Sequence, residues 1–314
     1  MLLGTIVEIT VTDKEKPQQA KADAIKQAFA EIARVENMLS RFKPDSDVSR
    51  INSFAQHEPI KVTPETIRLI EKSNEFSQLT NGAFDVTIQP LTEIWGLATK
   101  YREDPPKASQ ITKALNRVGY QNVKVVKNEQ SVAFTQPGMS IDLGGIAKGY
   151  AVDMAIQVLK KEGIRNALVN AGGDIYCLGQ PNQDNKWQIA VQHPRDKNST
   201  LTIIELRDKA IATSGDYQNY IQIKGKRYSH IINPKSGQPC TEVPASVTVL
   251  SADCLTADAL ATSIYVLGPE KGMNLINQLE NTEAIIVSFQ KGKLGVRVSA
   301  GLQQKRLQLS ACIR

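Results

Sequence analysis

The residues best suited to chemistry lie in the middle of the chain, where two glycines and a lysine follow a carboxylate. Asp142 precedes Gly144 and Gly145, and Lys148 opens a stretch with the apolar spacing of a helix. The first N–H groups of a helix lack intrahelical partners and favour an anion, and glycine lets a ligand approach the backbone closely. The stretch therefore predicts an anion site. A glycine turn followed by a solvated lysine would give the same pattern.

A second candidate lies towards the end of the chain. Asp258 and Thr262 are four residues apart in a predicted helix, so their side chains lie one above the other on one face. A carboxylate and a hydroxyl are hard oxygen ligands that suit Mg²⁺ or Ca²⁺. The alternative is an aspartate stabilised by the helix dipole, with a threonine that has no part in a site.

Of the chain's three histidines, His230 is the best placed for catalysis, because it stands at the end of a predicted strand just before an Asn-Pro turn. Loops after strands often carry functional residues, and a histidine with an unperturbed pKa of about 6.5 is a suitable general base. His57 lies in a polar loop and His193 near a predicted strand end. A histidine with a purely structural role at the end of a strand remains the alternative for His230.

These candidates are positioned by helices and strands that follow no regular βαβ alternation. The sequence therefore predicts an α+β fold, a single large domain over 1–314 with mixed, mainly antiparallel sheets and packed helices. Thr63 is the expected N-cap of a helix with Pro64 at its first position. Helices are predicted over 18–40, 64–79, 109–118, 256–266 and 269–279, with a turn and helix over 141–161 and a polar loop over 40–47. Strands are predicted over 4–12, 166–170, 174–178, 186–193, 201–206, 210–213, 219–223, 227–232, 245–250, 283–289 and 293–299, with a hairpin over 122–135.

Composition excludes several classes of function. The 38 basic residues are mixed with 32 acidic ones, so no dense basic block favours nucleic-acid binding. No stretch of about 18 apolar residues predicts a transmembrane helix. The four cysteines form no CxxC motif, which disfavours a zinc site, and a pair between Cys240 and Cys312 is left open. The first residues read as a strand rather than a signal peptide, so the chain is either cytoplasmic or lacks a leader that has been removed.

Two further turns are rich in glycine and small polar residues, at 170–174 and 213–217. Together with the candidates above, they resemble the FAD:protein FMN transferase (ApbE) family over nearly the whole chain. The matching pieces, in order, are Gly4-Thr5, Leu39-Ser40-Arg41-Phe42, Asp47 to Asn52, Asn81 to Thr87, Asp142 to Gly149, Asn170 to Asp174, Ser214-Gly215-Asp216, His230 to Pro234 and Thr256 to Thr262.

The resemblance implies an enzyme that splits FAD, attaches FMN through a phosphoester to a Thr or Ser hydroxyl of a target flavoprotein, and releases AMP. Such targets are typically subunits of membrane redox complexes. The expected location is the periplasm or the outer face of the cytoplasmic membrane, with the cytoplasm as the alternative. Two other functions remain open: hydrolysis of FAD to FMN and AMP, and FAD binding without catalysis.

The resemblance also assigns roles to individual residues. Asp258, Thr262 and the backbone carbonyl of Gly145 correspond to Mg²⁺ ligands, although the family often has Ala in place of Gly145. His230 is the candidate base that removes the proton from the incoming hydroxyl. The positions that resemble contacts with FAD are Leu39 (often Met in the family), Phe76, Val118, Gly119, Tyr120, Asp142, Lys148 and Ile232.

Overall fold

The computed structural model describes residues 1–97, 102–182, 185–196, 198–215, 220–240, 244–290 and 293–304. Its centre is a seven-stranded sheet in the order β1-β5-β6-β9-β12-β13-β14, and each neighbouring pair is antiparallel. The strands are β1 (Val7–Val11), β5 (Ala167–Ala171), β6 (Asp174–Leu178), β9 (Lys209–Gly215), β12 (Ser246–Ser251), β13 (Glu283–Gln290) and β14 (Lys293–Val298).

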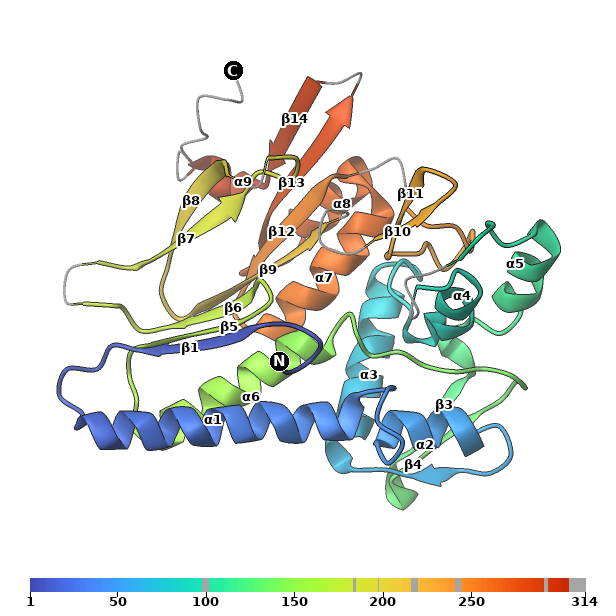
Figure 1. Cartoon of the computed structure of the whole chain (residues 1–314), viewed down its shortest axis with the longest axis horizontal. Helices are drawn as coiled ribbons and strands as arrows, with labels where there is room; N and C mark the ends of the chain where they lie inside the picture. Colours follow the sequence, from blue (N-terminus) through green and yellow to red (C-terminus); the bar gives the residue numbers. More distant parts are fainter. Residues whose placement is uncertain are drawn as a thin grey trace.

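One face of this sheet is covered by helices, as Figure 1 shows. Helix α7 packs on β9 and β12, α6 packs on β5 and β6, and α1 lies outside α6. Small buried residues on α6, among them Ala151 and Ala155, allow this close layering. These helices are α1 (Gln18–Leu39), α6 (Ala147–Lys161) and α7 (Cys254–Leu267). In the chain, α8 (Pro269–Ile276) follows α7, and α9 (Ala300–Gln304) follows β14.

The opposite face of the sheet is covered by a hairpin of β7 (Trp187–Gln192) and β8 (Thr200–Leu206). Burial alternates along β7, with Trp187, Ile189 and Val191 turned inward. This period of two is the pattern of a strand with one buried face. Together with residues of the sheet such as Ile211 and Ile285, these side chains form a second hydrophobic core.

A third group of elements packs beside the helical layer. It consists of the strands β2 (Ile60–Lys61), β3 (Val123–Val126) and β4 (Ser131–Phe134), the hairpin β10 (Tyr220–Ile223) and β11 (Lys226–Ser229), and the helices α2 (Asp47–Phe54), α3 (Pro64–Leu79), α4 (Gln89–Ile94) and α5 (Ala108–Leu115). Trp95, which follows α4, links this helix to the loop after β11, because its indole Nε1 donates a hydrogen bond of 2.8 Å to the Gly237 carbonyl.

The α+β prediction is confirmed, and most of the predicted elements occur within one to three residues of the expected ends. The Thr63 side chain accepts a hydrogen bond from Thr66 N, as predicted for an N-cap. The strand predicted over 227–232 ends at Ser229, because Ser229 Oγ accepts a bond from Ile231 N and turns the chain. None of the described helices is long and apolar enough to cross a bilayer.

The crossing of α6 and α7 depends on Gly149. A Cβ atom at this position would lie 2.3 Å from the carbonyl oxygen of Cys254 and 2.8 Å from Leu255 Cα. Asp153, one turn further along α6, accepts hydrogen bonds from Cys254 N at 2.8 Å and Leu255 N at 2.9 Å. The N-terminus of α7 is therefore held directly against α6 by backbone contact.

We expect Gly149→Ala to destabilise the protein, although alanine alone favours a helix by about 1 kcal/mol over glycine. The clash is with backbone atoms, so overpacking should cost about 1–3 kcal/mol of unfolding free energy, measured by urea denaturation. Gly295→Ala is the control, because its Cβ would meet its nearest neighbour at 3.4 Å. Equal stability of Gly149→Ala and the wild type would contradict the crossing described here.

Candidate active site

The glycine turn before α6 and the first turns of α7 meet in the structure. A Cβ atom placed on Gly145 would lie 3.5 Å from Thr262 Oγ1 and 3.2 Å from Phe84 Cε2. Ser214, at the end of β9, places its Oγ 3.3 Å from Thr262 Oγ1. The two segments that the sequence singled out therefore belong to one site, although more than a hundred residues separate them along the chain.

Two buried carboxylates from different elements lie beside Lys148. Asp258 on α7 and Asp174 at the start of β6 have side chains that are only 4% and 3% exposed. Asp258 Oδ2 accepts a hydrogen bond from Gly149 N at 3.2 Å. The ammonium of Lys148, whose side chain is 32% exposed, contacts Asp174 and lies 3.4 Å from both oxygens of Asp258. Lys148 is therefore an ion-paired residue rather than a solvated one.

The electrostatics of this cluster leave negative charge in excess. Burial and the nearby charge of Asp258 raise the pKa of Asp174 to about 7, although Lys148 acts in the opposite direction. Burial lowers the pKa of Lys148, but the two carboxylates outweigh it and hold that pKa above its usual value. When both carboxylates are ionised, the single ammonium neutralises only one of the two negative charges. A bound cation would neutralise the other.

The chemistry of the donor atoms fits a hard divalent cation. Asp258, Thr262 and the Gly145 carbonyl offer oxygen only, the ligand type that Mg²⁺ prefers, and Mg²⁺ commonly keeps several waters beside one or two carboxylates. Within the described ranges, no group of three or more His, Cys, Asp or Glu side chains is arranged to hold a metal. The three proposed ligands include no histidine nitrogen or cysteine sulfur, the ligands that are typical of zinc sites.

Asp142 and the segment 118–120 are both held by side chains that the sequence analysis did not assign. Arg41 Nε lies 2.8 Å from Asp142 Oδ2, and Gly144 N donates to Asp142 Oδ1 at 2.9 Å. Asp85 Oδ2 accepts from Tyr120 N at 3.0 Å. Asp85 also accepts from Thr87 Oγ1, which itself accepts from Gly119 N at 2.7 Å.

The apolar candidates fall into two groups. Leu39 and Phe76 are buried in the main core, and Phe76 packs edge-on against Phe84, the side chain beside Gly145, with ring centroids 6.1 Å apart. Ile232 belongs to a separate cluster with Trp95, and Val118 packs against that cluster. His230 is half-buried and directly follows β11.

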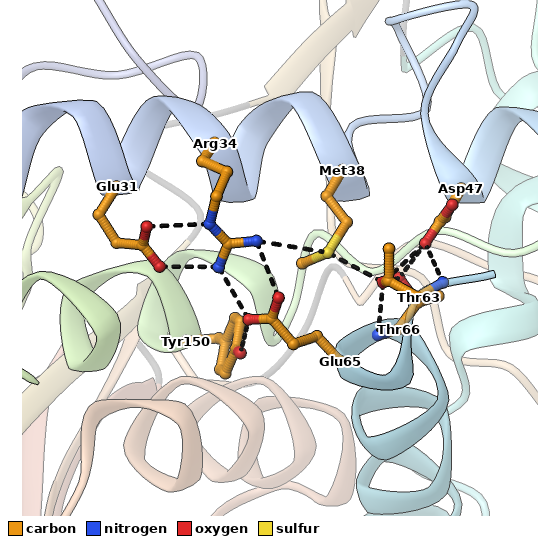
Figure 2. A network of polar contacts seen from close by, with 8 residues as sticks. All are labelled: Glu31, Arg34, Met38, Asp47, Thr63, Glu65, Thr66 and Tyr150. Carbon is orange, nitrogen blue, oxygen red and sulfur yellow. Dashed lines mark hydrogen bonds and ion pairs between the residues drawn. The ribbon is translucent and has the colours of Figure 1, made fainter. Parts of the chain in front are cut away.

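A polar network holds the end of α1 that carries Leu39, as Figure 2 shows. Arg34 bonds Glu31 and Glu65 at 2.7–2.9 Å, and Tyr150 of α6 donates to Glu65 at 2.6 Å. Thr63 Oγ1 lies 3.1 Å from the sulfur of Met38, the neighbour of Leu39. The network ties α1, α3 and α6 together next to the candidate site.

Asp47 accepts hydrogen bonds from three other residues, and two of them, Thr63 and Thr66, are drawn in Figure 2. Its carboxylate accepts from Thr63 N at 2.8 Å, Thr66 Oγ1 at 2.7 Å and Arg50 at 2.5 Å. Burial raises the pKa of Asp47, but these hydrogen bonds outweigh burial and place it below its ordinary value. The folded state therefore favours the ionised form.

We expect Asp47→Asn to lower the unfolding free energy by about 1–3 kcal/mol near pH 7, because an amide leaves buried donors without an acceptor. A lowered pKa contributes stability above the unfolded value of about 3.9 and loses it as the pH falls through the folded value. The deficit of the variant should therefore shrink in acid. Urea denaturation at a series of pH values measures it, and a deficit that is the same at every pH would contradict this origin.

Comparison with known proteins identifies the family. A sequence profile of the ApbE family matches residues 3–286. The chain belongs to the ApbE family. A Vibrio cholerae FAD:protein FMN transferase is 36% identical over 263 residues, covering 83% of this chain and 78% of that protein. A Klebsiella pneumoniae FAD:protein FMN transferase is 33% identical over 282 residues, covering 88% and 79%.

Solved ApbE structures share the fold. The Vibrio cholerae flavin transferase ApbE superposes with a TM-score of 0.84 at 31% identity, covering 97% of this chain and 96% of that one. The Thermotoga maritima ApbE protein gives a TM-score of 0.86 at 33% identity, with the same coverage. The predicted family and fold class are thus confirmed, and the extent of the domain over 1–314 stays a prediction.

Contacts join Gly145 with Thr262 and Lys148 with Asp258, and Asp258 and Thr262 lie one turn apart on α7. Asp174 and Ser214 lie in the turns at 170–174 and 213–217, and the sequence pattern assigned neither of them a role. An aspartate at the first position of an apolar strand was the available signal for Asp174, because a buried charge requires a partner. Asp216 and Cys312 lie outside the described residues, so the turn at Asp216 and the pair with Cys240 stay untested.

Proposed function

We propose that this chain is a Mg²⁺-dependent flavin transferase that cleaves FAD and attaches FMN to a Ser or Thr hydroxyl of an acceptor flavoprotein. The hydroxyl oxygen forms a bond to the phosphorus on the FMN side of the diphosphate. The bond from that phosphorus to the bridging oxygen breaks, and AMP leaves with that oxygen. Family membership and relatives named FAD:protein FMN transferase support the transfer itself.

The observation that carries the metal assignment is the contact between the Gly145 turn and Thr262, with the buried Asp258 one turn away on the same helix. These residues would hold Mg²⁺, which when bound neutralises diphosphate charge and stabilises the charge that grows on the departing AMP. Lys148 stands beside Asp258 and can act on the same diphosphate charge.

The remaining candidate residues would contact different parts of FAD or the acceptor hydroxyl. Asp142, fixed by Arg41, and the segment 118–120, fixed by Asp85, offer polar contacts. Leu39, Phe76 and Ile232 offer apolar ones. His230 takes the proton of the incoming hydroxyl, which is a poor nucleophile until it is deprotonated.

The acceptor that we propose is a flavoprotein subunit of a membrane redox complex, with the chain working outside the cytoplasm in the periplasm or at the outer face of the membrane. The sequence motifs that resemble the family support this proposal. Detection of covalent flavin on such a subunit after co-expression with this chain would test it, and flavinylation restricted to a cytoplasmic protein would contradict it.

Incubation with FAD and Mg²⁺, with and without an acceptor flavoprotein, tests the reaction. We expect covalent flavin on the acceptor, resolved by fluorescence after denaturing electrophoresis, and one AMP released for each flavin attached. AMP release at equal rates in both samples without covalent flavin would instead indicate FAD hydrolysis. FAD binding without any AMP release would indicate a binding module.

A further inference from the structure

The ammonium of Lys148 is shared unequally by two buried carboxylates. It contacts Asp174 directly, whereas both oxygens of Asp258 lie 3.4 Å away. A charge-assisted hydrogen bond from an ammonium to a carboxylate is usually about 2.7–2.9 Å long. Lys148 is therefore bonded tightly to Asp174, whereas its ion pair with Asp258 is long and weak.

This arrangement leaves the Asp258 carboxylate poorly satisfied for a buried group. Its closest donor is Gly149 N at 3.2 Å, and that bond involves Oδ2. A buried carboxylate normally accepts short hydrogen bonds or binds a cation. The lone pairs of Asp258 are thus left available on α7, the helix that also carries Thr262 one turn further on.

We propose that Asp174 is a positioning residue, which holds the Lys148 ammonium off Asp258 and so reserves the Asp258 carboxylate for a divalent cation. The inference rests on the proposed function, since it takes Asp258 as the metal ligand. Without the charge of Asp174, one ammonium and one carboxylate would remain in a buried site. They would close into an ion pair that competes with the cation.

The net charge of Lys148, Asp174 and Asp258 predicts how the affinity for a cation should differ between variants. With both carboxylates ionised, the wild-type trio of Lys148, Asp174 and Asp258 carries a net charge of −1 before a cation binds. The variant Asp174→Asn brings it to zero, and the double variant Asp174→Asn with Lys148→Met restores −1. Cation affinity should therefore fall in the single variant and recover in the double variant, although the double variant lacks two of the three side chains.

The experiment uses the full chain without FAD and Mn²⁺ alone as the probe, with free Mn²⁺ followed by electron paramagnetic resonance; Mn²⁺ shares the oxygen preference of Mg²⁺. We expect Asp174→Asn to raise the Mn²⁺ dissociation constant by about tenfold or more, and the double variant to return within about threefold of the wild type. The matched control is Asp13→Asn, which changes a buried carboxylate that bonds Arg165 N and Asn166 N at the opposite end of β5 from Asp174. It should leave the constant within about twofold.

An unchanged constant in Asp174→Asn would overturn the inference while leaving the proposed function intact. A loss that the double variant does not recover would also overturn it, because Asp174 would then act as a ligand or as a structural residue. If Asp174→Asn fails to fold, Lys148→Met alone decides, since it should bind Mn²⁺ at least as tightly as the wild type. A wild type that binds no Mn²⁺ would overturn the metal assignment of the proposed function as well.

Discussion

Replacing Asp258 with asparagine is expected to lower Mg²⁺-dependent flavin transfer by about 10³-fold, because a metal-bound carboxylate supports several kcal/mol of charge stabilisation in the transition state. Asp258 is buried and is the one carboxylate in the proposed set of ligands, which otherwise contains a hydroxyl and a carbonyl. An amide keeps the shape but removes the charge that attracts the cation. Initial rates of covalent flavin formation across a range of Mg²⁺ concentrations measure the effect.

The same substitution at Asp253 provides the control for Asp258→Asn. Asp253 caps the same helix by accepting a bond from Thr256 N at 2.7 Å, and an asparagine can still cap a helix. We expect this control to keep nearly all transfer activity. Normal transfer by Asp258→Asn at low Mg²⁺ would show that Asp258 is not a metal ligand, and the metal site would have to lie elsewhere.

The second large effect is expected at His230. His230→Ala should slow flavin transfer by about 10²–10⁴-fold, the usual contribution of a general base. FAD affinity, measured by flavin fluorescence titration, should change little, because the proton is removed from the acceptor hydroxyl and not from FAD. His193→Ala is the control, since its Nδ1 accepts a bond from Asp196 N at 3.0 Å beside the β7–β8 hairpin.

The pH dependence of the transfer rate further distinguishes a general base at position 230 from a binding or structural residue. If it acts as the base, the residual transfer by His230→Ala should rise with pH as hydroxide replaces it, and the acid limb of the wild-type rate profile should disappear. A parallel fall in FAD affinity and transfer rate would instead assign His230 to substrate binding or to the structure of the turn after β11.

The sequence predicted helices and strands well where apolar residues recur at regular spacing or a helix has a clear N-cap. The amphipathic spacing of 18–40 corresponds to α1, and Thr63-Pro64 marks the start of α3. The short helix α2 was missed, since its cap Ser46 stands in a run of polar residues that resembles a loop. Helix α7 begins at Cys254, two residues before the prediction, because its N-cap is Asp253.

The site could be predicted only in part, for a related reason. Local spacing places Asp258 above Thr262, but nothing local brings the Gly145 turn to the same place. The links between segments, such as Lys148 with Asp174 and Arg41 with Asp142, depend on the tertiary arrangement of α6, β6 and α1. Such contacts between distant segments leave no repeating pattern in the sequence from which they could be predicted.

The backbone contact between Gly149 and Cys254 has a consequence for biosynthesis. The glycine turn is made when less than half of the chain has left the ribosome, whereas α7 follows only after β12. A nascent chain that ends before Cys254 has the glycine turn but lacks Asp258 and Thr262. The newly made protein can therefore complete its candidate site only late, when α7 docks against α6.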